Sequence, residues 1–207
     1  MSKTPELIPL AEHDHALATV AAAFADHPLT PRDQPGEPKG TRTRRMMGML
    51  FKSFAKASDL HWFGIRGDDG RLQCFAMVYA YGYEPPKRQM AGMVWTMVRM
   101  LGLRKAWAYM RVMSQKHPGG GRRLELQLLA TRPDAQGKGL GRVMLRFLYD
   151  WASERGYDAV ILETAKDTPA FGFYGREGFE VTQELTVPDG VLCYMRRELG
   201  TTSKGGT

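Results

Sequence analysis

The sequence predicts an α/β fold in which one central mixed β-sheet is flanked by helices. Apolar runs of strand length alternate along the chain with segments whose apolar residues recur every three or four positions, as on one face of a helix. The runs at 72–80 and 158–164 are almost continuously apolar, which is typical of strands inside a sheet. The length of 207 residues suits one domain. We expect that domain to span residues 1–199, with an insertion at about 84–121 and a disordered tail at 200–207.

The first forty residues predict a short strand, a helix and a loop. Residues 6–10 form an apolar run between prolines, which restricts them to an edge strand. Residues 12–25 are rich in alanine and have good helix propensity. Residues 27–40 contain four prolines at short intervals and are expected to form a loop: Pro28, Pro31, Pro35 and Pro38.

The next segment predicts a helix and a β-hairpin. Residues 41–57 are helical, and one side of that helix is expected to carry Met46, Met49, Leu50 and Phe54. Strands at 60–66 and 72–80 are separated by Gly67-Asp-Asp-Gly70, a hairpin turn signal.

The insertion predicts a pair of helices over one end of the sheet. Met90, Met93, Met97 and Leu101 recur at helical spacing, and a second helix is expected at 103–115 after a break at Gly102. This methionine-rich stripe has three interpretations. It packs in the core or at an interface, it forms an adaptable apolar wall of an acceptor pocket, or it is a basic amphipathic helix on a membrane surface.

The stretch from Leu124 to Trp151 predicts a site for a negatively charged group. An apolar strand at 124–131 is followed by a turn and then by a glycine-rich opening to a strongly periodic helix. The first amides of a helix have no partner inside it, and the helix dipole places partial positive charge there. Glycines allow a phosphate to approach those amides, and Lys138 adds a full charge.

The remaining elements complete the sheet. A buried strand at 158–164 is followed by a short helix, for which Thr168 is the predicted cap and Pro169 the first residue. That helix is expected to end at Gly178, before a terminal hairpin of strands at 179–187 and 191–197.

The glycine-rich spacing matches neither a Walker loop nor a dinucleotide fingerprint. It reads Gln-x-x-Gly-x-Gly, from Gln136 to Gly141, after a strand that ends in Leu-Leu-Ala-Thr. Farther along, Asp167-Thr-Pro-Ala170 precedes Phe173-Tyr174 and then Gly178-Phe179. These two motifs, in this order, closely resemble those of the GNAT superfamily of acyl-CoA-dependent N-acyltransferases. The resemblance covers the C-terminal half well and implies a GNAT-like fold.

The resemblance also implies acetyl-CoA as acyl donor. No metal is expected, because the five histidines are scattered and show no metal-ligand spacing. The residues that bind acetyl-CoA would come from the strand end, the loop and the helix start: Leu129, Ala130, Thr131, Gln136, Gly137, Lys138, Gly139, Leu140, Gly141, Arg142 and Asp167. The strand residues would pair with the pantetheine arm, and a backbone amide there would polarise the thioester carbonyl. Asp167 replaces the usual asparagine and departs from the pattern, so it is either a CoA contact or only a helix cap.

Two residues are candidates for proton transfer. Tyr174 stands where the family often has a tyrosine that protonates the CoA thiolate; alternatively it packs the helix against the sheet. Glu125 stands eleven positions before Gln136, where some relatives carry a base for the amine. A carboxylate in an apolar strand has its pKa raised, which suits a base; alternatively Glu125 pairs with Arg122 or Arg123. With regular alternation, Glu125 would share its face of the strand with Gln127 and Leu129.

Composition narrows the range of partners. The formal charge is +7, and every charged residue between Glu84 and Glu125 is basic: Lys87, Arg88, Arg99, Arg104, Lys105, Arg111, Lys116, Arg122 and Arg123. This indicates a solvated basic face that also attracts CoA, although nucleic acid and anionic membrane are alternatives. No nucleic-acid motif and no membrane-length apolar run occurs, so neither partner is expected, while a homodimer remains open.

Cys74 and Cys193 lie in apolar segments and indicate buried thiols in a reducing, cytoplasmic setting. Neither suits a covalent acetyl-enzyme. We therefore expect an N-acetyltransferase that transfers acetyl from acetyl-CoA to a small-molecule primary amine by direct attack in a ternary complex. The alternative is a GNAT-fold module that binds acyl-CoA, or presents its basic surface, without turnover.

Overall fold

A computed structural model describes residues 4–25, 27, 30, 33–55, 57, 59–84 and 86–200. The elements follow the predicted order: β1 (Glu6–Leu7), a 3₁₀ turn (Leu10–Glu12), α1 (His13–Phe24), α2 (Thr41–Phe54), β2 (His61–Arg66), β3 (Leu72–Ala80), α3 (Lys87–Leu101), α4 (Leu103–Met113), β4 (Arg123–Thr131), a 3₁₀ turn (Pro133–Ala135), α5 (Leu140–Glu154), β5 (Ala159–Ala165), α6 (Pro169–Arg176), β6 (Glu180–Val187) and β7 (Gly190–Glu198). The predicted α/β architecture is confirmed. The tail predicted to be disordered lies outside the described residues from 201 onward.

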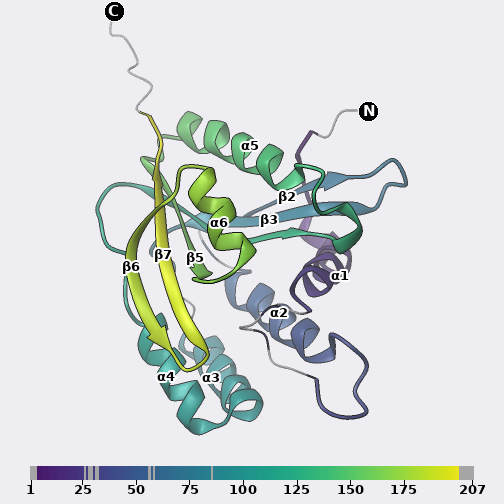
Figure 1. Ribbon diagram of the computed structural model, residues 1–207, viewed down its shortest axis with the longest axis vertical. Helices are drawn as coiled ribbons and strands as arrows, with labels where there is room; N and C mark the ends of the chain where they lie inside the picture. The colour runs from purple at the N-terminus through teal and green to yellow at the C-terminus, as the bar shows by residue number, and fades with distance from the viewer. Residues whose placement is uncertain are drawn as a thin grey trace, which may run out of the picture.

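One seven-stranded mixed sheet runs through the molecule in the order β1-β2-β3-β4-β5-β7-β6 (Figure 1). Every neighbouring pair is antiparallel except β4 and β5, which are parallel. Their ladder is short, because it runs only from Arg123↔Ala159 to Glu125↔Ile161. The rest of β4 therefore pairs only with β3 and leaves its other edge without a strand partner.

Helices cover both faces of the sheet, as predicted. Helix α5 packs one face through Met144, Leu145 and Leu148, in a core that also contains Leu124 and Leu126 of β4. Helices α1 and α2 cover the other face, in a core of their own: Ala16, Leu17, Val20, Met47, Phe51, Trp62, Phe75, Met77, Leu128 and Ala130. Helix α4 packs against β6 and β7 through Val112, and the α3–α4 pair projects at the lower end of the molecule in Figure 1.

A β-bulge changes the predicted alternation of β4. The register with β3 passes from Val78↔Leu126 to Met77↔Leu128, so Gln127 has no partner across the ladder. An unpaired residue reverses the phase of the side chains beyond it. As a result Leu126 packs on the α5 side, whereas Leu128 packs on the side of α1 and α2. The prediction that Glu125 shares its face with Leu129 is therefore wrong.

The structure refines the buried side of α2, places α3 at the surface and corrects the length of the first strand. Of the expected residues of α2, Met46, Leu50 and Phe54 are partly buried and pack against the core, while the fully buried apolar residues are Met47 and Phe51 beside them. Helix α3 lies largely at the surface, and none of its described side chains is fully buried. Strand β1 has only two residues, because the chain turns into a 3₁₀ helix at Leu10.

The predicted helix ends are confirmed. Thr168 Oγ1 accepts a hydrogen bond from Phe171 N at 3.3 Å, and Pro169 is the first residue of α6. Gly178 follows α6 with φ +86°, and Gly156 follows α5 with φ +72°. Left-handed backbone of this kind after a helix is a common role of glycine.

Candidate active site

The loop before α5 presents peptide N–H groups that have no partner. Gly137 and Gly139 adopt φ of +74° and +77°, which side chains other than glycine rarely accept. The first backbone hydrogen bond of α5 runs from Val143 N to Gly139 O at 3.1 Å. In the described part of the chain, no acceptor in hydrogen-bond geometry faces the N–H groups from Gly137 to Arg142. This segment can therefore bind an anion through its backbone, as predicted.

Side chains around the loop shape it. Gln136 Nε2 donates to Thr131 O at 3.1 Å and ties the loop to the end of β4. Lys138 Nζ donates to Asp134 O at 2.9 Å, so its charge stays at the loop. A Cβ on Gly141 would lie 3.3 Å from Phe173 Cζ, so a side chain there would crowd the contact between α5 and α6. Arg142 Nε lies 2.7 Å from Glu177 Oε1.

The predicted strand residues line the unpaired edge of β4. Leu129, Ala130 and Thr131 pair with Ala76, Phe75 and Cys74 of β3, and none pairs with β5. Their other edge can accept an extended ligand as an additional strand would. Asp167 is exposed immediately before α6, where Thr168 is the cap, so the alternative that Asp167 caps this helix is wrong.

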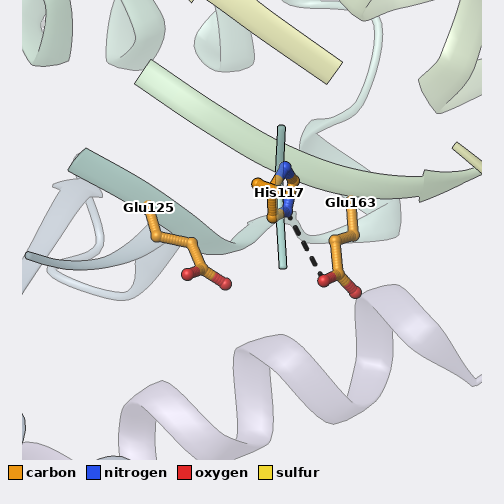
Figure 2. A group of neighbouring side chains, drawn as sticks. All are labelled: His117, Glu125 and Glu163. Carbon is orange, nitrogen blue, oxygen red and sulfur yellow. Dashed lines mark ion pairs between the residues drawn. The ribbon is translucent and has the colours of Figure 1, made fainter. Parts of the chain in front are cut away.

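Three titratable side chains gather where β4 and β5 separate: Glu125 of β4, Glu163 of β5 and His117 of the loop after α4 (Figure 2). Their nearest ligand atoms all lie within 4.8 Å of one another, and His117 Nε2 is 3.5 Å from Glu163 Oε1. In Figure 2 both carboxylates point away from their strands toward the same side. Glu125 is 9% exposed and His117 5%, whereas the side chain of Glu163 is 34% exposed.

The imidazole of His117 is held by aromatic rings. It stacks on Tyr194 with centroids 3.9 Å apart and meets the edge of Tyr81 at 5.8 Å. The His117 backbone N also donates to Tyr81 Oη at 2.9 Å. Both ring nitrogens are buried and make no hydrogen bond among the described residues. An unsatisfied buried polar atom is costly, which indicates a group that a ligand completes.

Glu125 has the electrostatics of a base that works near neutral pH. Burial, followed by the nearby charge of Glu163, raises its pKa to about 8. The Tyr79 hydroxyl and the Arg123 guanidinium favour the ionised form and oppose that rise. The predicted direction of the pKa shift is confirmed.

The alternative that Glu125 pairs with a neighbouring arginine is wrong. The backbone N of Arg122 donates a hydrogen bond to Asp158 Oδ2 at 2.6 Å, and Arg122 Nη2 lies 3.5 Å from Asp59 Oδ2. Arg123 Nη1 donates to His117 O at 3.0 Å, and its guanidinium lies over the Tyr81 ring. Within the described residues, no ion pair joins either arginine to Glu125.

Tyr174 is buried in the core on the α5 side, with its ring 5.5 Å from that of Phe179. Burial raises the pKa of its hydroxyl, which keeps it protonated. Glu125 points to the opposite face from its neighbours Leu124 and Leu126, which belong to the same core as Tyr174. The structure therefore does not bring the two predicted catalytic residues into contact, and the acid role of Tyr174 stays a prediction.

Cys74 and Cys193 are free and buried, as predicted. Burial raises the pKa of the Cys74 thiol to about 11, which makes it a poor nucleophile.

His117 and Glu163 were not among the predicted site residues. Glu163 had a signal, because it is a lone charge in an apolar strand; parallel pairing of Glu125 with Ile161 places it two residues farther along on the same face. His117 had none, since it reaches the site from a loop through stacking on Tyr194.

The same three residues offer the donor types that bind Zn²⁺. Donor atoms around a tetrahedral zinc lie roughly 3.5 Å apart, and the His117–Glu163 pair already has that separation. Three acceptors around an ammonium nitrogen, each in a hydrogen bond of about 2.9 Å, lie roughly 4.7 Å apart. The group, whose nearest atoms lie within 4.8 Å of one another, therefore has donors that suit an ammonium as well as a metal ion.

Comparisons with known proteins agree with this fold. The model of the Acetyltransferase (GNAT) family matches residues 33–179. No curated protein sequence matches. Among solved structures, "histone acetyltransferase HPA2 and related acetyltransferase" from Corynebacterium glutamicum is 21% identical, with a TM-score of 0.64 over 95% of this chain and 96% of that one.

Further solved structures share the fold at lower identity. An alanine N-acetyltransferase of a ribosomal protein from Escherichia coli is 16% identical, with a TM-score of 0.59 over 99% and 98% of the two chains. A mutant spermidine N-acetyltransferase from Vibrio cholerae is 13% identical, with a TM-score of 0.54 over 95% and 93%. Because the family model covers most of the chain and the fold agrees, this protein belongs to the GNAT family of acetyltransferases, which use acetyl-CoA as co-substrate.

Proposed function

We propose that this protein transfers the acetyl group of acetyl-CoA to a primary amine of a small molecule, by direct attack in a ternary complex. The observation that carries the proposal is the group of His117, Glu125 and Glu163 at the point where β4 and β5 part. Its spacing suits the three donors of a primary ammonium, and its two carboxylates attract that charge.

The co-substrate would lie between the loop and this group. Its pyrophosphate suits the unpartnered N–H groups from Gly137 to Arg142. Thr131 and Glu125 are six residues apart on β4, which is about 20 Å of strand. An arm extended along the unpaired edge of β4 would lead from the loop to Glu125. When bound, the thioester supplies an activated acetyl carbon.

Glu125 is assigned as the base. Its carboxylate takes a proton from the docked ammonium, which leaves a neutral amine to attack the acetyl carbon. The new N–C bond forms, the attacking nitrogen loses a second proton to solvent, the C–S bond breaks, and the departing thiolate takes up a proton. Tyr174 is the proposed donor of that proton, and the backbone N–H at the Gln127 bulge is the proposed partner of the carbonyl oxygen.

The surroundings of Glu125 favour a small acceptor with an organic body. Its partner across the ladder is Tyr79. The ring of Tyr79 lies 4.8 Å from Phe54 of α2, and Phe54 lies 5.9 Å from Tyr83. Such aromatic rings pack the apolar part of an amine and attract its cation.

The test combines binding and turnover. Acetyl-CoA should raise the melting temperature, because a ligand that binds only the native state stabilises it. A panel of primary amines with acetyl-CoA should then include compounds that release free CoA and gain one acetyl group by mass spectrometry.

Glu125→Gln should retain the thermal shift and lose turnover, while Glu154→Gln, an exposed control on α5, should retain both. Stabilisation by acetyl-CoA without turnover on a broad amine panel would instead support a binding module. Absence of any thermal shift would contradict the proposal as a whole.

A further inference from the structure

The helical hairpin of α3 and α4 keeps large apolar side chains in solvent. Trp95 is 63% exposed, Leu103 70% and Trp107 61%. The described side chains of α3 include none that is fully buried. Helix α4 is anchored on one side only, where Ala106 and Val112 are buried. The hairpin therefore carries an uncovered apolar surface, which on a soluble protein marks an interaction site.

Every charged residue of the same hairpin is a cation. Its exposed cations are Lys87, Arg88, Arg99, Arg104, Lys105 and Arg111. Among the described residues, only Lys105 of this group has an ion-pair partner, Asp189 at 2.6 Å. The Arg111 guanidinium lies 6.0 Å over the ring of Trp107, so charge and apolar surface occur at the same place.

We propose that this hairpin docks the protein on an anionic lipid bilayer. Tryptophan prefers the boundary between headgroups and acyl chains, and arginine keeps its charge at the phosphates while its stem covers apolar surface. Helices with apolar and basic surfaces lie in that boundary, held by apolar burial and by attraction to anionic lipids. No helix in the described part of the chain has both the length and the apolar character of a membrane span, so this association is peripheral.

The positive charge of this surface favours an anionic bilayer as its partner over a second copy of the chain. A two-fold dimer through this surface would bring the same residues of both copies together, and among the described residues only Lys105 of these cations has a carboxylate partner. Charge and shape also favour the bilayer over nucleic acid. Phosphate contacts use the cations alone and give no reason for Leu103 to stand in solvent next to Arg104.

Docking is independent of acyl transfer and can be measured without an acceptor amine. The probes are vesicles of phosphatidylcholine alone and of phosphatidylcholine mixed with phosphatidylglycerol. Trp62 and Trp151 are buried, so a blue shift of tryptophan emission on vesicle addition reports Trp95 and Trp107. We expect cosedimentation and a blue shift with the anionic vesicles only, and no blue shift in the Trp95→Phe, Trp107→Phe variant.

Charge reversal gives the matched control. Arg99→Glu with Arg104→Glu should weaken binding on the order of a hundredfold or more, because each cation near the surface contributes about 1 kcal/mol. Arg71→Glu with Arg176→Glu, on other exposed parts of the chain, changes net charge equally and should leave binding nearly unchanged.

Several results would overturn the proposal. One is the absence of binding to anionic vesicles. Others are an equal loss in both double variants, or binding without a change in emission. Binding to duplex DNA but not to vesicles, or a blue shift that appears with protein concentration alone, would assign the surface to nucleic acid or to a dimer.

Discussion

Glu125 is a buried carboxyl group with a second carboxylate nearby, so its protonation should affect stability. Its pKa of about 8 in the folded state lies above the ordinary value of 4.5. Folding therefore favours the protonated form. The cost of ionising it is absent below about pH 4.5, grows as the pH rises toward 8, and is complete above that.

We predict that Glu125→Gln stabilises the protein relative to wild type at high pH. Glutamine resembles the protonated carboxyl, so the two proteins should differ little near pH 4.5, and the variant should be more stable at pH 9 by a few kcal/mol at most. Urea unfolding across this range measures the difference. A constant gap between the two proteins would show that Glu125 is not perturbed.

Glu163 should affect both the binding of the amine and the pKa of Glu125. Glu163→Gln removes a charge-assisted hydrogen bond to the docked ammonium, worth about 1.5–3 kcal/mol, so kcat/KM for the amine should fall roughly tenfold to a hundredfold. It also removes the like charge that raises the pKa of Glu125, so the limb of the pH–rate profile that rises with pH should move to lower pH. Glu154→Gln is the control. If the rising limb of the pH–rate profile stays in place in Glu163→Gln, Glu163 does not act on Glu125.

The Tyr174→Phe substitution distinguishes a role of Tyr174 as proton donor from a role in packing alone. Phenylalanine keeps the ring that packs against Phe179, so folding should be almost unchanged. If the hydroxyl protonates the thiolate, turnover should drop about a hundredfold while acetyl-CoA affinity stays the same. Steady-state kinetics with a thermal-shift titration measures both. Wild-type turnover in this variant would remove Tyr174 from the mechanism.

At the scale of elements, the loop before α5 is the proposed binding site for acetyl-CoA, and Gly139→Asp tests it. The substitution places a carboxylate beside the unpartnered N–H groups and strains a residue at φ +77°. We expect acetyl-CoA affinity to fall on the order of a hundredfold or more, with a stability cost of about 1 kcal/mol.

Gly70→Asp is the matched control for backbone strain. Gly70 has φ +72° in the turn between β2 and β3, with open space around its Cα. The Gly70→Asp variant should show a similar stability cost, and calorimetry should show an unchanged affinity for acetyl-CoA. Equal affinities in both variants would contradict the loop assignment.

The elements also show how far the sequence could predict the structure. Local signals sufficed for the glycine loop, for the Thr168 cap and for the break at Gly102, because each depends on residues close together in the chain. The bulge at Gln127 has no such signal, since it arises from the register between β4 and β3. The face of α2 was offset because periodicity indicates an apolar side and the sheet decides its angle.

At the scale of the whole molecule, the candidate site depends on how distant segments meet. Glu125 and the loop could be predicted, because both lie on one continuous stretch that resembles the family motif. His117 and Glu163 could not be predicted as partners, because they join Glu125 only through β4–β5 pairing and stacking on Tyr194. The exposure of the hairpin tryptophans also required the structure, since periodicity alone left a packed stripe, a pocket wall and a membrane-surface helix open.

The most direct test of the acyl-transfer proposal is the pH dependence of kcat/KM for an amine acceptor, in wild type and in Glu125→Gln. With Glu125 as the base, the wild-type rate should rise with pH through about 8 and then level off. The variant should lose this limb and be slower by a hundredfold or more, in line with the usual contribution of a general base. A limb of the same shape and midpoint in both proteins would contradict the assignment of Glu125 and of the group around it.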